Sequence, residues 1–105
     1  MDRRFLDIAI KQLDWERYRR GYGNDAEVVT LKYRLREIDK NGHPVELTES
    51  EVAILQNSTK HSIRHILNYD YQLPNAEELR DEALNPLYEF ILELNTQEAT
   101  NESQS

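Results

Sequence analysis

The sequence predicts an all-α fold, a small helical bundle, from three observations. Apolar residues recur at spacings of three and four along several stretches, as they do on one face of a helix. Typical N-cap residues stand just before these stretches. Hydrophobic residues make up 38% of the 105 residues, and this content suits one modest core. We expect a single helical domain over residues 1–95 and a disordered polar tail over 96–105, because the tail has no apolar anchor.

The first predicted element is an N-terminal helix within residues 1–22. One of its faces carries apolar residues at the i, i+3, i+4 and i+7 positions, namely Leu6, Ala9, Ile10 and Leu13. Gly21 and Gly23 follow, and glycine readily adopts the backbone conformations that end a helix. The helix is therefore expected from about Asp2 to Arg20, ahead of a second unit that fills residues 24–95.

Residues 28–47 fit two structures. Asn24, with Glu27 three residues later, is typical of a helix start, and a helical stripe follows at Val28, Leu31, Leu35 and Ile38. The same segment also alternates apolar and polar residues, and Asp39–Gly42 suits a hairpin turn. We favour the helix because the cap fits and Gly42 suits its end, while the β-hairpin stays open.

Two short helices are predicted next. Thr48 and Glu51 form a capping box, which starts a helix that ends near Gln56. Asn57–Thr59 are expected to interrupt the helical path, because their side chains compete for backbone hydrogen bonds. A second helix with Ile63, Ile66 and Leu67 on one face follows this interruption.

Two further helices complete the predicted domain. Pro74 and Asn75 open one of them, and Asn85–Pro86 is expected to break it and to start the last, since proline suits a first helical position. The last helix has one strongly apolar face, made of Leu84, Leu87, Tyr88, Ile91 and Leu92.

The two short helices on either side of Asn57 have the arrangement of a helix-turn-helix. Such a unit needs a small residue where its helices cross and a turn residue that tolerates a left-handed backbone, and Ala53 and Asn57 suit these places. Ile63 and Ile66 fall where the second helix must face the core. The polar residues around them are the candidate DNA contacts: Thr59, Lys60, His61, Ser62, Arg64 and His65. Two such short helices also occur in ordinary helical bundles, and this alternative stays open.

From Leu47 to Leu79 the sequence resembles the Cro and lambda-repressor-like helix-turn-helix family. Leu47–Ala53 is similar to that family's run of leucine-serine-glutamine-glutamate-glutamate-leucine-alanine, without a gap. Ser58–Ile66 resembles the family's turn and recognition helix. The resemblance implies a lambda-repressor-like five-helix unit over about Asn24 to Leu94, with the N-terminal helix as an addition. It also implies a small DNA-binding transcription regulator of phage or bacterial type that acts as a homodimer.

Three positions depart from that family's pattern. The family usually has glutamine at Glu49, glycine at Asn57 and an aliphatic residue at Ser58. In the family the glutamine lies near phosphate, so a carboxylate at that position repels DNA.

The net charge of −7 is unevenly distributed and suggests a second function. Residues 1–65 contain 12 basic and 11 acidic residues, whereas residues 66–105 contain 1 and 9. A near-neutral first part leaves room for a local basic surface that binds DNA. The acidic second part instead predicts a protein-interaction module, an adaptor or an inhibitor, that binds a basic groove of a partner protein.

Other classes of function find little support in the sequence. There is no cysteine, and no glycine-rich phosphate loop follows a strand. His61 and His65 stand four apart, but Arg64 beside them opposes a cation, so we expect neither a metal site nor a cofactor. No nucleophile, base and stabiliser assemble, so we expect no enzyme. No apolar stretch approaches the roughly 20 residues that a membrane span needs, and a cytoplasmic location is expected.

Overall fold

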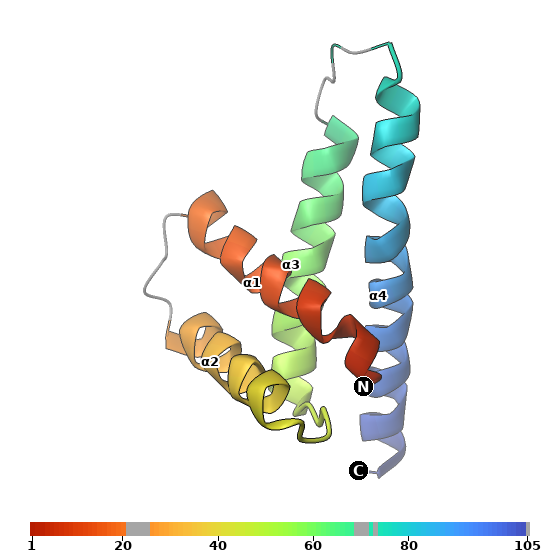
Figure 1. Ribbon diagram of the computed structural model, residues 1–105. Helices are drawn as coiled ribbons and strands as arrows, with labels where there is room; N and C mark the ends of the chain where they lie inside the picture. Colours follow the sequence, from red (N-terminus) through yellow and green to blue (C-terminus); the bar gives the residue numbers. More distant parts are fainter. Residues whose placement is uncertain (21–25, 69–71, 73, 105) are drawn as a thin grey trace.

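The described part of the chain contains four α-helices in the computed structural model, and two of them form an antiparallel hairpin (Figure 1). The structure describes residues 1–20, 26–68, 72 and 74–104, with side chains for 1–14, 26–68, 72 and 74–99. A 3-10 turn, η1, precedes α1, and the elements in chain order are η1 (Arg3–Phe5), α1 (Leu6–Arg20), α2 (Ala26–Asn41), α3 (Glu49–Asn68) and α4 (Ala76–Gln104). No strand occurs among these residues, so the all-α class is confirmed.

The hairpin is formed by α3 and α4, and α1 crosses it with α2 alongside (Figure 1). The predicted N-terminal helix is confirmed as η1 and α1. The predicted closure at Gly21 and Gly23 and the predicted cap at Asn24 lie outside the described residues. None of the described helices is both long and apolar enough to span a membrane.

Residues 26–41 form the helix α2, so the alternative β-hairpin is wrong for them. The helix ends at Gly42, whose φ of 69° lies in the left-handed region that glycine adopts without a Cβ clash. The His43 N–H donates to the Ile38 carbonyl at 3.2 Å, which is the hydrogen bond of a Schellman ending. The Arg3 guanidinium adds a second cap, because it donates to the Asp39 carbonyl at 2.8 Å. The end of α2 is thus fixed by its own turn and by η1.

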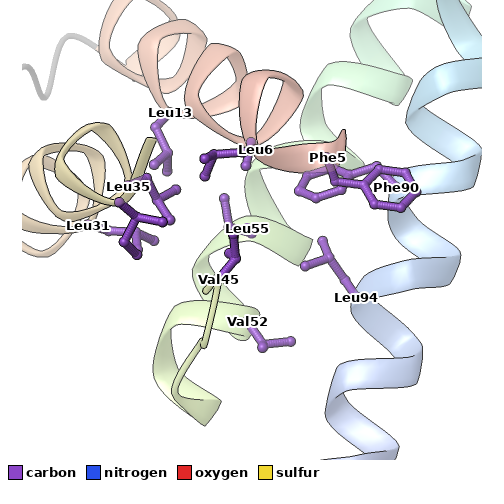
Figure 2. Packing of buried hydrophobic residues seen from close by; sticks show 12 residues of the cluster. Phe5, Leu6, Leu13, Leu31, Leu35, Val45, Val52, Leu55, Phe90 and Leu94 are labelled. Atoms are coloured by element: carbon purple, nitrogen blue, oxygen red, sulfur yellow. The ribbon is translucent and has the colours of Figure 1, made fainter. Parts of the chain in front are cut away.

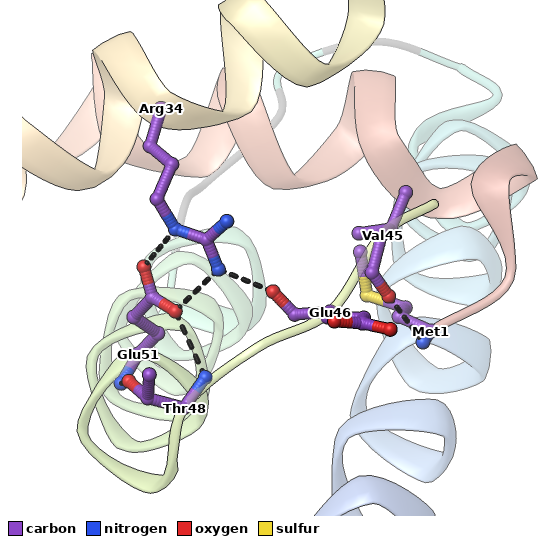
Figure 3. Close-up of polar contacts among 6 residues, drawn as sticks. All are labelled: Met1, Arg34, Val45, Glu46, Thr48 and Glu51. Carbon is purple, nitrogen blue, oxygen red and sulfur yellow. Dashed lines mark hydrogen bonds and ion pairs between the residues drawn. The ribbon is translucent and has the colours of Figure 1, made fainter. Parts of the chain in front are cut away.

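The predicted capping box at the start of α3 is confirmed (Figure 3). The Thr48 N–H donates to Glu51 Oε1 at 2.8 Å, and the Glu51 N–H donates to Thr48 Oγ1 at 3.2 Å. Arg34 of α2 clamps the same carboxylate, with its Nε and Nη2 donating to the two oxygens at 2.7 and 2.6 Å. The Arg34 guanidinium also donates to the Glu46 carbonyl. This group of bonds holds α2 and the segment before α3 against the helix start.

The contact between Arg34 and Glu51 shifts the pKa of both side chains. Hydrogen bonding to Arg34 lowers the pKa of Glu51, and bonding to Thr48 acts in the same direction, while burial opposes both. The hydrogen bond to Glu51 raises the pKa of Arg34. The carboxylate is therefore held ionised by the geometry that starts α3.

The predicted interruption at Asn57–Thr59 is wrong, because α3 runs unbroken from Glu49 to Asn68. Asn57 faces solvent, where its side chain leaves the helix hydrogen bonds intact. The Thr59 hydroxyl donates to the Leu55 carbonyl at 2.6 Å, one turn back along the same helix. The polar groups that suggested a turn are thus satisfied within a continuous helix.

The predicted break at Asn85–Pro86 is also wrong, because α4 continues through Pro86. Proline removes one helical hydrogen bond, but Leu84 and Leu87 on either side of it are buried and hold the helix in place. Since neither break occurs, the described residues contain four α-helices, and the lambda-repressor-like five-helix unit is not found as predicted.

Residues 96–104, predicted as a disordered tail, are helical in α4. Gln56 of α3 contacts the first part of this segment. Its Nε2 donates to Asn95 Oδ1 at 3.2 Å and to Glu98 Oε2 at 2.8 Å. Polar contact between α3 and α4 therefore extends past the last core residue, Leu94.

The core lies where α1 and α2 meet the lower half of the hairpin (Figure 2). Phe5 stacks on Phe90 with ring centroids 5.9 Å apart, which joins η1 to α4. Leu55, Phe90 and Leu94 are fully buried at this centre. The full cluster comprises Phe5, Leu6, Ala9, Leu13, Leu31, Leu35, Ile38, Val45, Val52, Leu55, Phe90 and Leu94. Both predicted apolar stripes, on α1 and on α2, contribute to it.

Candidate interaction surfaces

The six residues predicted to contact DNA divide between two faces of α3. Thr59 and Ser62 are buried, at 0% and 7% exposure, and their hydroxyls donate to the carbonyls one turn earlier. Lys60, Arg64 and His65 are exposed, whereas His61 is half-buried. The structure therefore does not bring the six together on one accessible face, because the buried pair packs into the bundle.

The residues expected to shape the core of the predicted helix-turn-helix also differ from their expected positions. Ala53 was expected at a close helix crossing but is exposed, because the unbroken α3 has no second short helix to cross it. Ile63 and Ile66 are half-buried and not core residues.

Three of the four basic residues of α2 pair with carboxylates of neighbouring helices, whereas Lys40 is exposed. Lys32 Nζ lies 2.5 Å from Asp14 Oδ1 of α1, and the Lys32 side chain is only 14% exposed. Arg36 approaches the same carboxylate at 3.7 Å, and Arg34 binds Glu51 as described above. These cations join helices, so they form no continuous basic surface for phosphate.

The outer face of α4 combines exposed apolar and acidic side chains. Tyr88 and Leu92 lie one turn apart and are 44% and 66% exposed. Exposed acidic residues of the same helix accompany them, namely Glu77, Glu78, Asp81, Glu82, Glu89 and Glu98. Arg80, the basic residue of this helix, is half-buried. We call the exposed side of α4 that carries Asp81, Tyr88, Glu89 and Leu92 the α4 outer face.

A pocket of about 580 Å³ lies between α1, α3 and α4. Its walls are mostly apolar and include Ile8, Ile66 and Leu87. Gln12 also lines it, and this side chain is 92% buried, at 8% exposure. The Gln12 Oε1 atom accepts no hydrogen bond from any residue that the structure describes. The atom has almost no accessible surface, and a buried acceptor without a donor is costly to the folded state.

A metal centre finds no counterpart in the described residues. No three side chains of the histidine, cysteine, aspartate or glutamate types gather there.

In comparisons with known proteins, no family model, no curated protein and no solved structure matches this chain. Function is therefore argued from the surfaces alone.

The α4 outer face was missed by the sequence reasoning, although a signal for it exists. Tyr88 and Leu92 were assigned to one apolar face together with Leu84 and Leu87. The spacing of the buried residues Leu84, Leu87, Phe90 and Leu94 defines a stripe of its own, and Tyr88 and Leu92 lie off that stripe. The buried side chain of Gln12 carries no comparable signal, because its burial depends on how α1 crosses the hairpin.

Proposed function

We propose that this protein is a protein-interaction module that binds a partner protein through the α4 outer face. The observation that carries the proposal is the exposed pair Tyr88 and Leu92 among acidic side chains. Exposed aromatic and aliphatic residues supply the apolar contact area on which an interface depends. The surrounding carboxylates favour a partner with a basic surface, because complementary charge speeds association and excludes partners of like charge.

The same charge argues against a homodimer through this face. Two copies would place the acidic residues of one α4 against those of the other, and such repulsion costs stability. A homodimer therefore belongs with the DNA-binding alternative.

Capture experiments with matched variants test the proposal. The wild-type chain is used as bait in host lysate, beside Leu92→Ala and Glu89→Lys. We expect stoichiometric capture of a basic protein, with clear loss for both variants and weaker capture at high salt. Tyr33→Ala is the control, because Tyr33 is 63% exposed on α2 and lies away from the α4 outer face. Equal capture by Leu92→Ala, Tyr33→Ala and the wild type would overturn the proposal, as would recovery of nucleic acid alone.

DNA binding is a second candidate, favoured by one observation. Lys60 and Arg64 are both exposed and stand one turn apart on α3. In this alternative the protein is a transcription regulator whose α3 contacts phosphate or base edges with these two cations. Selection from a random DNA pool tests it, followed by gel shifts of Lys60→Ala and Arg64→Ala at stated salt. Enrichment of a palindrome favours the regulator, and no enrichment favours the interaction module.

A further inference from the structure

We infer that the partner of the α4 outer face is a second copy of this chain, bound through the exposed side of its α3. The inference rests on the proposed function, because it names what the α4 outer face binds. Exposed residues of α3 follow one another at alternating intervals of four and three residues, as they do where one helix packs along another. We call this side the α3 outer face, and its residues are Ala53, Asn57, Lys60, Arg64 and Leu67.

The two outer faces carry opposite charge. Residues 52–68 of α3 contain two cations, Lys60 and Arg64, and no acidic residue. Residues 77–98 of α4 contain seven acidic residues and one basic residue. Within the part of the chain that the structure describes, neither of the two cations has an ion-pair partner, and neither Asp81 nor Glu89 has one. Each copy therefore presents one surface that attracts the other outer face of a second copy.

The spacing of the exposed residues also matches between the two faces. The α4 outer face shows the same alternation of four and three residues, at Asp81, Asn85, Tyr88 and Leu92. When the two helices are antiparallel, Arg64 of one copy comes opposite Asp81 of the other. In the same alignment the small Ala53 comes opposite Leu92, which leaves room for the larger side chain.

A parallel contact fits less well. If Lys60 of one copy lies opposite Asp81 of the other, Leu92 falls beyond Asn68, the last residue of α3. The most exposed apolar side chain of α4 then stays uncovered. The antiparallel contact alone joins the opposite charges and covers this side chain.

A contact between unlike faces avoids the repulsion that opposes packing of α4 on α4. Every copy has one face of each kind, so the contacts close into a ring of two or more copies or continue as a filament. In a ring of two, α3 of each copy lies on α4 of the other. The inference thus predicts self-association that depends on both outer faces.

Sedimentation of the full chain over a range of concentrations is the first test. We expect the average mass to rise above that of one chain with concentration, and to fall back at high salt. Arg64→Glu places like charges opposite each other and should weaken the association by about ten-fold. Lys40→Glu is the matched control, because Lys40 is an exposed cation of α2 outside both faces, and it should associate as the wild type does.

Mixing two variants assigns the contact to the two faces. The double variant Lys60→Glu, Arg64→Glu loses the α3 outer face and keeps that of α4. The double variant Tyr88→Ser, Leu92→Ser loses the α4 outer face and keeps that of α3. All four residues are exposed, so both proteins should remain helical by circular dichroism. Each should be monomeric alone, whereas the mixture should form a 1:1 complex through the one intact face of each kind.

The inference is overturned by any of three results. The first is a wild-type chain that stays monomeric up to its solubility limit at low salt. The second is association that persists in either double variant alone. The third is a mixture of the two that forms no complex. The proposed function stands through any of these results if capture from lysate still depends on Leu92, so the two failures are distinguishable.

Discussion

The two ends of the α3–α4 hairpin differ in how they are covered and packed. At the end near Leu55 and Phe90, both helices are covered by α1, α2 and the segment around Val45, and apolar side chains fill the centre (Figure 2). At the other end, α3 and α4 extend past α1 and α2 (Figure 1), and the buried residues among those described are Ser62 of α3 with Leu84 and Leu87 of α4. We call these the closed end and the open end. The contrast indicates that stability is concentrated at the closed end, while the open end leaves surface and space for binding.

The largest expected effect tests this contrast directly. Phe90→Ala at the closed end removes the ring that stacks on Phe5 and leaves a cavity in the core, so it should lower the free energy of unfolding by about 3–5 kcal/mol. Leu67→Ala at the open end removes a side chain that is already 47% exposed, and should cost less than about 1 kcal/mol. Urea unfolding of the two variants measures both. Similar losses would show that the two ends share the stability equally.

Replacing Pro86 is expected to stabilise the open half of α4. Pro86→Ala restores a backbone donor inside the helix and should raise the free energy of unfolding by about 1–3 kcal/mol. Asn85→Ala is the matched control, because it changes an exposed neighbour without altering the backbone, and its gain should stay near 0.5 kcal/mol. Thermal unfolding of both proteins gives the comparison. A destabilised Pro86→Ala would mean that α4 needs the proline at this position.

The stability of the closed end depends on pH through the carboxyl group of Glu51. Its pKa is lowered in the folded state by the hydrogen bonds from Arg34 and Thr48. A carboxyl with a lowered folded-state pKa contributes stability above its unfolded pKa, about 4.3, and that stability is lost as the pH falls through the folded value. Glu51→Gln should therefore cost about 1–2 kcal/mol at pH 7, and the difference from wild type should shrink below about pH 4.

Urea titrations of this variant across pH provide the measurement. Glu49→Gln is its control, since Glu49 is an exposed acidic residue in the same first turn. A difference between wild type and Glu51→Gln that stays constant down to acid pH would contradict the assigned role of the Arg34 clamp.

The smallest expected effect concerns the buried hydroxyls of α3. Thr59→Val keeps the shape of the side chain and removes a hydroxyl whose partner, the Leu55 carbonyl, belongs to the same helix. Because no other group loses its partner, the change should stay within about 1 kcal/mol. A much larger loss, by the same urea assay, would show that the hydroxyl is needed to position α3 against its neighbours.

Much of the fold could be predicted from the sequence where a signal is local. The capping box at Thr48 and Glu51, the end of α2 at Gly42 and the apolar stripe of α1 each depend on residues within one or two turns. The wrong breaks at Asn57 and Pro86 have the opposite origin. Both residue types favour an interruption locally, and packing of α3 against α4 on either side outweighs that preference.

The candidate surfaces were harder to predict for the same reason. Whether Thr59 faces solvent or the core depends on whether the helix is interrupted at Asn57. Because α3 is continuous, Thr59 lies one turn after Leu55 and faces the core with it. Gln12 is buried in α1, and its Oε1 atom has no donor among the residues that the structure describes. Contacts between distant segments of the chain determine the direction of Thr59 and the burial of Gln12, and the local spacing of residues does not predict these contacts.

The stack of Phe5 on Phe90 has a consequence for the order of folding during synthesis. The two rings are 85 positions apart in sequence, so η1 cannot reach its final packing until most of α4 has left the ribosome. Until then Phe5 lacks its stacking partner, and the part of the core that η1 shares with α4 stays incomplete. Protease digestion of nascent chains stalled before Phe90 and after Leu94 should reveal late, concerted protection of the N-terminal half.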